Sequence, residues 1–187
     1  MLKKYISKRL SMRTKNLLMI DYYRAKARMF GKKSNYESIE KLHLGCGKRI
    51  VKGWLNVDLM DSQYDVDLGN KILPFKSNHF NDIVSQHVIE HLDLEEELIP
   101  LLKESKRVLK ENGRIWLSCP DMEKVCKAYI NDKGEALIND RKKRFPEFNM
   151  YNLPKQHIIN LLFHQSGTHK NLFDYDLLKY VLNKSGF

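Results

Sequence analysis

A glycine turn between two short apolar segments constrains this chain more than any other feature. Residues 41–47 read Lys-Leu-His-Leu-Gly-Cys-Gly, and residues 54–58 read Trp-Leu-Asn-Val-Asp. Each segment has the length and composition of a short buried strand. Glycine lets the backbone of the turn between them approach another molecule without a side chain in the way. The pattern predicts a strand, a glycine turn whose N–H groups face a ligand, and a second strand that ends in a carboxylate.

The spacing of these residues favours a ligand with one ribose and no pyrophosphate. A carboxylate at the end of the second strand, here Asp58, can accept hydrogen bonds from both ribose hydroxyls. The dinucleotide fingerprint requires a third glycine, a helix and an acid about 20 residues further on. In this chain Ile50 stands at the third glycine position, and Asp58 comes too early for a helix and a strand. A smaller nucleoside-containing cofactor is therefore expected.

The turn and the blocks that follow it resemble the class I S-adenosylmethionine (SAM) dependent methyltransferases. The likeness is closest to a predicted small-molecule group that is often linked to polysaccharide biosynthesis. His43 and Arg49 depart from the family pattern, which has an acid and a glycine at these positions. The resemblance implies a Rossmann-like α/β fold, a mostly parallel sheet with flanking helices, and SAM as the cofactor. The matching blocks are residues 41–47, 53–59, 73–75, 78–84, 87–92, 107–115 and 119–121, in the family's order.

The resemblance also implies which residues hold the cofactor. The turn would contact the methionine half through its backbone, Asp58 would bind the ribose, and Asp67 would lie at the edge of the adenine. The end of the fourth strand would face the cofactor as well. The expected cofactor-binding residues are Gly45, Cys46, Gly47, Asp58, Leu59, Asp67, Leu68, Gln86 and His87.

Methyl transfer from SAM requires little from the protein beyond alignment and desolvation. A base is needed only where the acceptor is a hydroxyl or amine that must lose a proton, and histidine titrates in the right range. His87, His91, His164 and His169 are candidates, and we assign the catalytic role to His169 and His91. His169 lies in the variable region where the family builds its acceptor site.

Residues 87–91, His-Val-Ile-Glu-His, admit two metal-based alternatives. His-x-x-Glu-His is a zinc protease pattern when both histidines share a helix, but His87 ends a strand-like run. Small-RNA 2′-O-methyltransferases also resemble this stretch: Glu90 and His91 match two of their metal ligands, His87 replaces a third, and His164 or His169 would be the distant one. The sequence expectation is a site without a metal.

Composition is typical of one intracellular domain. The chain has 187 residues and three cysteines, none in a Cys-x-x-Cys pair. A chain of this length can bury a real core, and isolated cysteines fit a reducing compartment. No apolar run approaches the roughly 18 residues that a membrane span requires. We expect a cytoplasmic protein, peripheral at the membrane if its N-terminal segment binds lipid.

The charge excess of the chain is confined to its beginning. Residues 1–33 hold eleven Lys or Arg and one acid, whereas the rest of the chain is balanced, although the whole carries +10. We interpret 1–33 as a basic, partly helical arm and 34–187 as the methyltransferase domain. The arm would bind an anionic surface, lipid or nucleic acid, or else pack on the domain through apolar residues such as those at 17–20.

Apolar periodicity predicts alternating strands and helices. Strands are expected near 41–45, 54–58, 64–67, 82–86 and 113–118. A helix is expected over 93–111, capped by Asp93 with Glu96 as its partner and ended by Gly113. Further helices are expected from 121 to 130, from 154 to 163 and from 174 to 185. The terminal hairpin of the family is missing, so the fifth strand is expected to be an open edge, covered by a partner copy or by region 120–170 unless the chain is a truncated form.

The predicted function is SAM-dependent methyl transfer to a small-molecule oxygen or nitrogen, such as a sugar or glycolipid precursor. One alternative is an RNA methyltransferase that uses the basic arm. The other is a non-catalytic SAM-binding protein. Expected partners are the small-molecule acceptor, an anionic membrane surface, and a second copy of the chain at the sheet edge.

Overall fold

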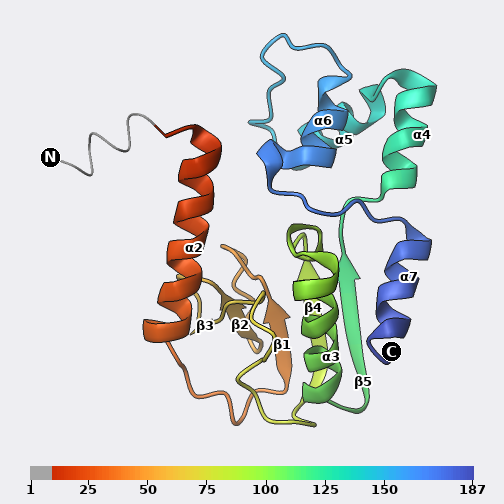
Figure 1. The fold of residues 1–187 in the computed structure, drawn as a ribbon. Helices are drawn as coiled ribbons and strands as arrows, with labels where there is room; N and C mark the ends of the chain where they lie inside the picture. Colours follow the sequence, from red (N-terminus) through yellow and green to blue (C-terminus); the bar gives the residue numbers. More distant parts are fainter. Residues whose placement is uncertain (1–9) are drawn as a thin grey trace, which may run out of the picture.

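A five-stranded parallel sheet forms the centre of the molecule, in a computed structural model that describes residues 10–187. Its strand order is β3-β2-β1-β4-β5, and every pairing is parallel. The Rossmann-like α/β prediction is therefore confirmed (Figure 1). The strands lie close to the predicted positions, although β3 has only two residues and is shorter than the predicted range of 64–67. They are β1 (Lys41–Leu44), β2 (Leu55–Asp58), β3 (Tyr64–Asp65), β4 (Phe80–Gln86) and β5 (Leu109–Ser118).

The helices include one that the sequence did not indicate. The segment of α5 is rich in charge and carries no clear apolar period, and it begins after Gly134 in the left-handed region at φ 88°. Helices α4 and α7 start where the sequence predicts, and Asp121 and Asp174 cap them, each accepting from an amide three residues on. The helices are α2 (Met12–Phe30), α3 (Ile99–Val108), α4 (Met122–Asp132), α5 (Glu135–Arg144), α6 (His157–His164) and α7 (Tyr175–Lys184). Short helical turns are η1 (Ile89–His91), η2 (Leu94–Leu98) and η3 (Gln165–Gly167).

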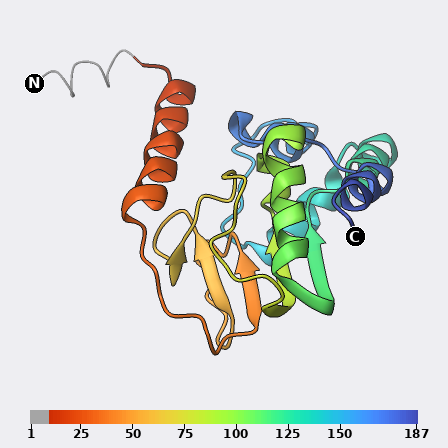
Figure 2. The ribbon, with the colours of Figure 1, turned by 60° about the horizontal axis from the view of Figure 1, so that its bottom comes forward.

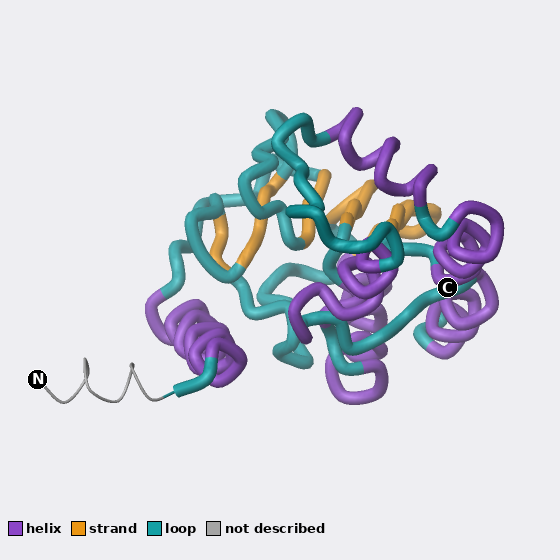
Figure 3. Tube along the Cα trace, turned by 90° about the horizontal axis from the view of Figure 1, so that it is seen from above, coloured by secondary structure: helices purple, strands orange, loops and turns teal. Residues whose placement is uncertain are grey.

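The main core lies between the sheet and two helices on one of its faces. Leu42, Leu55 and Ile83 share this face and are at most 1% exposed. Leu102 of α3 and Val181 of α7 close the same cluster from the helix side, and Figure 3 shows both helices on one side of the strands. Each fully buried aliphatic side chain contributes about 1.5–3 kcal/mol. This packing fixes the carboxyl ends of β1 and β4, where the candidate site lies.

The helix predicted over 93–111 differs from α3 at both ends. It ends at Val108 because Leu109 already pairs with Phe80 in the sheet. Asn112, at φ 61°, and Gly113 belong to an irregularity inside β5 instead of a helix stop. At the beginning, Asp93 caps the chain as expected, but Glu97 accepts from its N–H in place of Glu96. The first turn is wide, of the π type, which brings a later residue back to the cap.

Helix α2 is docked at its C-terminal half, where Ala27 is buried and charged pairs reach the domain. Arg24 and Arg28 form ion pairs with Asp67. After the helix, the backbone of Lys33 forms an isolated antiparallel β-bridge with Tyr64. Leu17, Leu18 and Met19 are each more than 50% exposed, so the expectation that they pack on the domain is wrong. Figures 1 and 2 show the N-terminal part of α2 standing away from the sheet. Residues 1–9 of the predicted arm lie outside the described part. No described helix has the length and apolar character to cross a bilayer.

Helices α4, α5 and α6 form a second, smaller cluster around Ile138 and Ile158. They rise beyond the carboxyl ends of the strands (Figure 1). Within residues 10–187, β5 is an edge strand, as the sequence predicts. Coverage of this edge by region 120–170 was one of three alternatives, and no strand of that region pairs with β5. Trp116 on β5 is 52% exposed.

Candidate cofactor and acceptor site

One pocket opens at the carboxyl ends of β1 and β4, where open α/β sheets bind their ligands. Five of the predicted cofactor residues line it, from the glycine turn and the end of β4. Three further lining residues, His43, Lys48 and Arg49, were not predicted as contacts, although two of them are the departures from the family pattern. The lining residues are His43, Gly45, Cys46, Gly47, Lys48, Arg49, Gln86 and His87.

The N–H groups of the glycine turn are already bound within the protein. Those of Gly45 and Cys46 donate to the carbonyl of Val57 over 2.9 and 3.0 Å. The N–H of Gly47 donates to Asp58. The prediction that these N–H groups face a ligand is wrong because no helix follows the turn, and its amides close on β2 instead. The turn offers a ligand its bare backbone surface.

Gly45 is required for two separate reasons. Its φ is 68°, in the left-handed region that L-residues with side chains rarely adopt. In addition, a Cβ atom at this position would collide with Val88. Gly47 also has a positive φ, of 52°, but a Cβ there would meet open space. The turn thus passes close under the segment that follows β4.

Asp58 connects the end of β2 to the turn. Its Oδ2 accepts from the Gly47 N–H over 2.7 Å, and its Oδ1 accepts from the Leu59 N–H over 2.7 Å. Each carboxylate oxygen can accept a second hydrogen bond. Asp58 is therefore oriented and still able to accept two hydroxyl donors. Leu59 lies next to it and is not part of the pocket lining.

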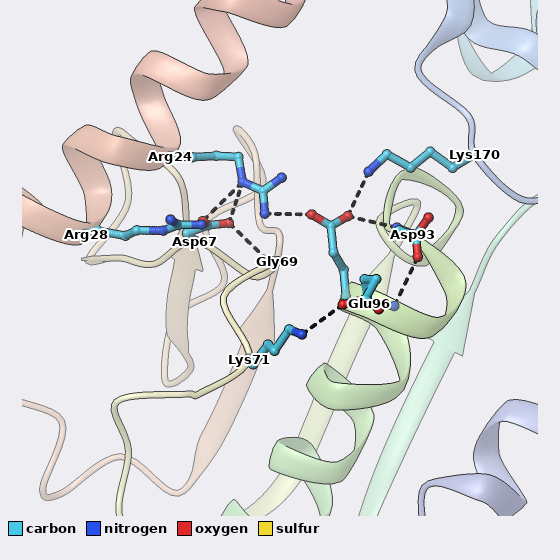
Figure 4. A network of polar contacts seen from close by, with 9 residues as sticks. Arg24, Arg28, Asp67, Gly69, Lys71, Asp93, Glu96 and Lys170 are labelled. Carbon is cyan, nitrogen blue, oxygen red and sulfur yellow. Dashed lines mark hydrogen bonds and ion pairs between the residues drawn. The ribbon is translucent and has the colours of Figure 1, made fainter.

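Asp67 has a different position from the one predicted. Its side chain is 2% exposed and pairs with Arg24 and Arg28, and its Oδ1 also accepts from the Gly69 N–H over 3.0 Å (Figure 4). Neither Asp67 nor Leu68, which is buried in the core, lines the pocket. In this arrangement Asp67 holds α2 against the domain. Nothing in the sequence between 24 and 67 signals this pair.

Positive charge lies at the mouth of the pocket. Arg49 donates to the side-chain oxygen of Gln86 over 3.0 Å, which joins the turn to the end of β4. Lys48 lies beside it in the lining. These two cations can attract the carboxylate of a ligand bound over the glycine turn. His43, buried under the turn, is held by Asn56 through Nδ1 at 3.1 Å.

The two histidines predicted to be catalytic lie together. The rings of His91 and His169 are 4.8 Å apart, edge to face. Burial and the neighbouring His91 lower the pKa of His169. His87, which lines the pocket, contacts Glu90 through Nδ1 at 3.3 Å. His164, the other candidate, is exposed at the end of α6.

Backbone and charged contacts fix the segment that carries His169. The N–H groups of Lys170 and Asn171 donate to the carbonyl of Glu90 over 2.8 and 3.2 Å. Lys170 also reaches Glu97 over 2.8 Å, and Glu97 in turn binds Arg24 over 2.7 Å. Figure 4 shows this network joining α2, η2 and the 170 region. The network positions residues from distant parts of the sequence beside the end of β4.

Neither cysteine near the site has the properties of a nucleophile. Burial and the nearby Asp58 raise the pKa of Cys46 to about 11. Burial and the nearby Glu90 raise the pKa of Cys119 to about 12. A thiol is reactive as its thiolate, so both side chains are packing groups near neutral pH.

Comparison with known proteins places the site inside a recognised domain type. A family model described as a methyltransferase domain matches residues 42–117. This range contains the glycine turn, Asp58, the end of β4 and the Glu90–His91 pair. A search of curated proteins found no match.

Three solved structures are among those to which this chain is similar. A SAM-dependent methyltransferase, possible histamine N-methyltransferase, from Thermotoga maritima is 16% identical, with 88% of this chain and 70% of that chain covered and a TM-score of 0.46. The YcgJ protein from Bacillus subtilis is 14% identical, with 87% of this chain and 66% of that chain covered and a TM-score of 0.44. The trans-methyltransferase CalH, solved with S-adenosylhomocysteine, is 12% identical, with 89% of this chain and 48% of that chain covered and a TM-score of 0.43. The chain thus spans from about half to 70% of these proteins' lengths.

Proposed function

We propose that this chain is a class I SAM-dependent methyltransferase and that it transfers the methyl group to a small-molecule oxygen or nitrogen. The observation that carries the proposal is the pocket at the ends of β1 and β4, built on the Gly45–Gly47 turn with Asp58 beside it. The pocket lies within the matched methyltransferase domain of residues 42–117.

The residues present fit the cofactor. The turn presents bare backbone where Cβ atoms would fill the space or collide, Asp58 can accept two hydroxyl hydrogen bonds, and Lys48 and Arg49 supply positive charge for a carboxylate. SAM, when bound, supplies an activated methyl group on a sulfonium. In this proposal the protein's own residues orient the reactants and exclude water. Gln86 and His87 also line the pocket, and His87 contacts Glu90, which lies beside the histidine pair.

In this proposal the acceptor loses its proton on the side of the pocket where His91 and His169 lie. These rings lie next to Glu90, and Glu90 contacts the pocket residue His87. A base in this position suits a hydroxyl or amine acceptor. A sugar or glycolipid precursor belongs to this class, and it is the acceptor we propose on the resemblance to small-molecule methyltransferases.

Incorporation of label from methyl-tritiated SAM tests the acceptor class. The full chain is incubated with small-molecule, lipid and RNA fractions of a cell extract, and each fraction is counted after separation. We expect label in the small-molecule or lipid fraction, with loss of that label in Asp58→Ala. Label in RNA that falls steeply with salt would favour the RNA alternative. Binding of S-adenosylhomocysteine without label in any fraction would favour a non-catalytic SAM-binding protein.

We also propose that α2 contacts an anionic membrane surface. Leu18, Tyr22 and Met29 recur at helical spacing and are 54%, 62% and 66% exposed, with the exposed Lys26 on the same stripe. Basic residues near an anionic surface contribute about 1 kcal/mol each. Sedimentation with phosphatidylglycerol vesicles tests this: we expect binding that is absent with phosphatidylcholine and reduced in Leu18→Ser/Tyr22→Ser. Equal sedimentation of the variant and the parent protein would contradict it.

A further inference from the structure

We propose that Glu90, His91 and His169 form a binding site for one divalent transition-metal ion. One ligand atom from each residue lies within 4.8 Å of the others. Two imidazoles and a carboxylate suit zinc, cobalt, manganese or iron in the divalent state. This proposal replaces the sequence expectation of a site without a metal. With an ion bound, His91 and His169 are ligands and no longer act as the base for the acceptor's proton.

The hydrogen bonds of the two histidines leave one ring nitrogen of each available as a metal ligand. Nδ1 of His91 is 3.2 Å from the carbonyl oxygen of Thr168, and Nδ1 of His169 is 2.8 Å from that of Leu162. A carbonyl oxygen only accepts, so each Nδ1 carries the proton and each Nε2 is left as an acceptor. Metal-binding histidines are held in this way, with the second ring nitrogen donating to a backbone carbonyl or carboxylate.

Two polar side-chain atoms of these residues are buried without a hydrogen-bond partner in the part of the chain that the structure describes. The Glu90 side chain is 2% exposed, and its Oε1 faces Nδ1 of His87. Neither Oε2 of Glu90 nor Nε2 of His169 has a partner among residues 10–187. Both atoms are acceptors, so they cannot satisfy each other, and a buried unpaired acceptor is costly. A bound cation satisfies them together. A proton shared between Glu90 and His169 is the competing explanation.

The ligands are fixed independently of any ion. The carbonyl of Glu90 accepts from the N–H groups of Lys170 and Asn171. The side chain of Asn171 also donates to the carbonyl of Leu92 over 2.6 Å. These bonds join the η1 turn to the segment that carries His169. A pre-arranged site costs less ordering entropy when it binds its ion.

The location suggests what the ion does, and this step rests on the proposed function. Three protein ligands leave positions open for water or an acceptor oxygen. A hydroxyl bound to a divalent ion gives up its proton more readily, and water accepts that proton here because both histidines are ligands. The site would therefore select acceptors that carry a hydroxyl able to reach the ion from the pocket lined by His87.

Titration of the chelator-treated full chain with Co²⁺, followed by visible absorption, tests the site directly. We expect one ion per chain, at least tenfold weaker binding in Glu90→Gln and in His169→Asn, and unchanged binding in His164→Asn. The last variant is the matched control because His164 is an exposed histidine from the same region. Binding of S-adenosylhomocysteine, measured separately, shows that each variant is folded and keeps failure of the metal site distinguishable from failure of the methyltransferase proposal.

Thermal stability separates an ion from a shared proton. For a metal site, Co²⁺ raises the Tm of the parent protein and not that of Glu90→Gln, and in chelator Glu90→Gln is at least as stable as the parent. For a shared proton, Co²⁺ changes neither Tm, and Glu90→Gln is less stable in chelator. The second result, or equal Co²⁺ binding by the parent and both ligand variants, would overturn the proposal.

Discussion

The N–H of Gly47 donates to Oδ2 of Asp58 over 2.7 Å, so the last residue of β2 holds the turn that follows β1. The same carboxylate also accepts from the N–H of Leu59. Asp58 therefore shapes the pocket in addition to presenting its oxygens to a ligand. Binding and stability should both depend on it.

Replacement of Asp58 by alanine should destabilise the protein by about 1–3 kcal/mol, because the hydrogen bonds to a charged acceptor are lost. Asp58→Asn should lose less, since its amide oxygen can still accept from one of the two N–H groups. Urea denaturation curves of the three proteins measure this difference. Equal stability of Asp58→Ala and the parent would show that the turn does not need the carboxylate.

Gly45→Ala should destabilise the protein more than Gly53→Ala does. Both positions have a positive φ, of 68° and 81°, but only at Gly45 does the new Cβ collide with Val88. Left-handed backbone strain costs about 1–2 kcal/mol, and the collision adds to it. The double variant Gly45→Ala/Val88→Ala should recover part of the difference when the free energies of unfolding are compared. If the two single variants lose the same free energy of unfolding, the contact between a Cβ at residue 45 and Val88 does not destabilise the protein.

The stability that the Glu97 carboxylate contributes should be lost in acid. Burial alone would raise the pKa of Glu97. Hydrogen bonds from Lys170, the Asp93 N–H and Arg24 outweigh burial and lower this pKa from 4.5 to about 2. A carboxyl with a lowered folded-state pKa stabilises the protein above its unfolded pKa, and that contribution is lost as the pH falls from about 4.5 toward 2. At pH 7, Glu97→Gln should therefore cost about 1–3 kcal/mol, with the difference from the parent shrinking toward pH 2.

Urea denaturation at pH 7, 4 and 3 measures this pH dependence. Glu96→Gln is the matched control, since the Glu96 side chain is 73% exposed and pairs only with the exposed Lys71 among the described residues. A Glu97→Gln difference that stays constant from pH 7 to pH 3 would mean that the network of Figure 4 does not act through the ionised carboxylate.

Gly69→Ala should loosen α2 from the domain. A Cβ atom at residue 69 would occupy the space of the Arg24 guanidinium and would approach Glu97. Hydrogen exchange of the α2 amides should accelerate, as it should in Arg24→Ala, while the amides of α7 keep their protection. Unchanged exchange in α2 would show that Arg28 and Asp67 alone hold the helix.

Local sequence signals predicted much of this fold. Apolar runs located the five strands, and Asp93, Asp121 and Asp174 marked helix starts correctly because a cap is decided within one turn. The glycine turn was placed at the pocket, and Asp58 beside the turn, for the same reason: the strands that carry them are short and strongly patterned.

Contacts between distant segments could not be predicted in this way. The pairing of Arg24 with Asp67, which takes a predicted adenine contact out of the pocket, joins residues far apart in the chain. The same holds for His169, whose place beside Glu90 depends on the path of the chain through α4, α5 and α6. The exposed Leu17, Leu18 and Met19 also contradict the alternative in which these residues pack on the domain, since α2 is docked further along the helix by Ala27 and by charged pairs.

Calorimetric titration with S-adenosylhomocysteine tests the central claim most directly, with the parent protein, Asp58→Ala and Asp140→Ala compared at one temperature. Asp140 is the control because it lies on α5, away from the pocket, with its side chain 56% exposed. We predict binding in the micromolar range by the parent and by Asp140→Ala, a loss of at least tenfold in Asp58→Ala, and no binding of NAD by any of them. Absence of binding by the folded parent protein, or equal affinity in Asp58→Ala, would contradict the claim that this pocket holds the methyl donor.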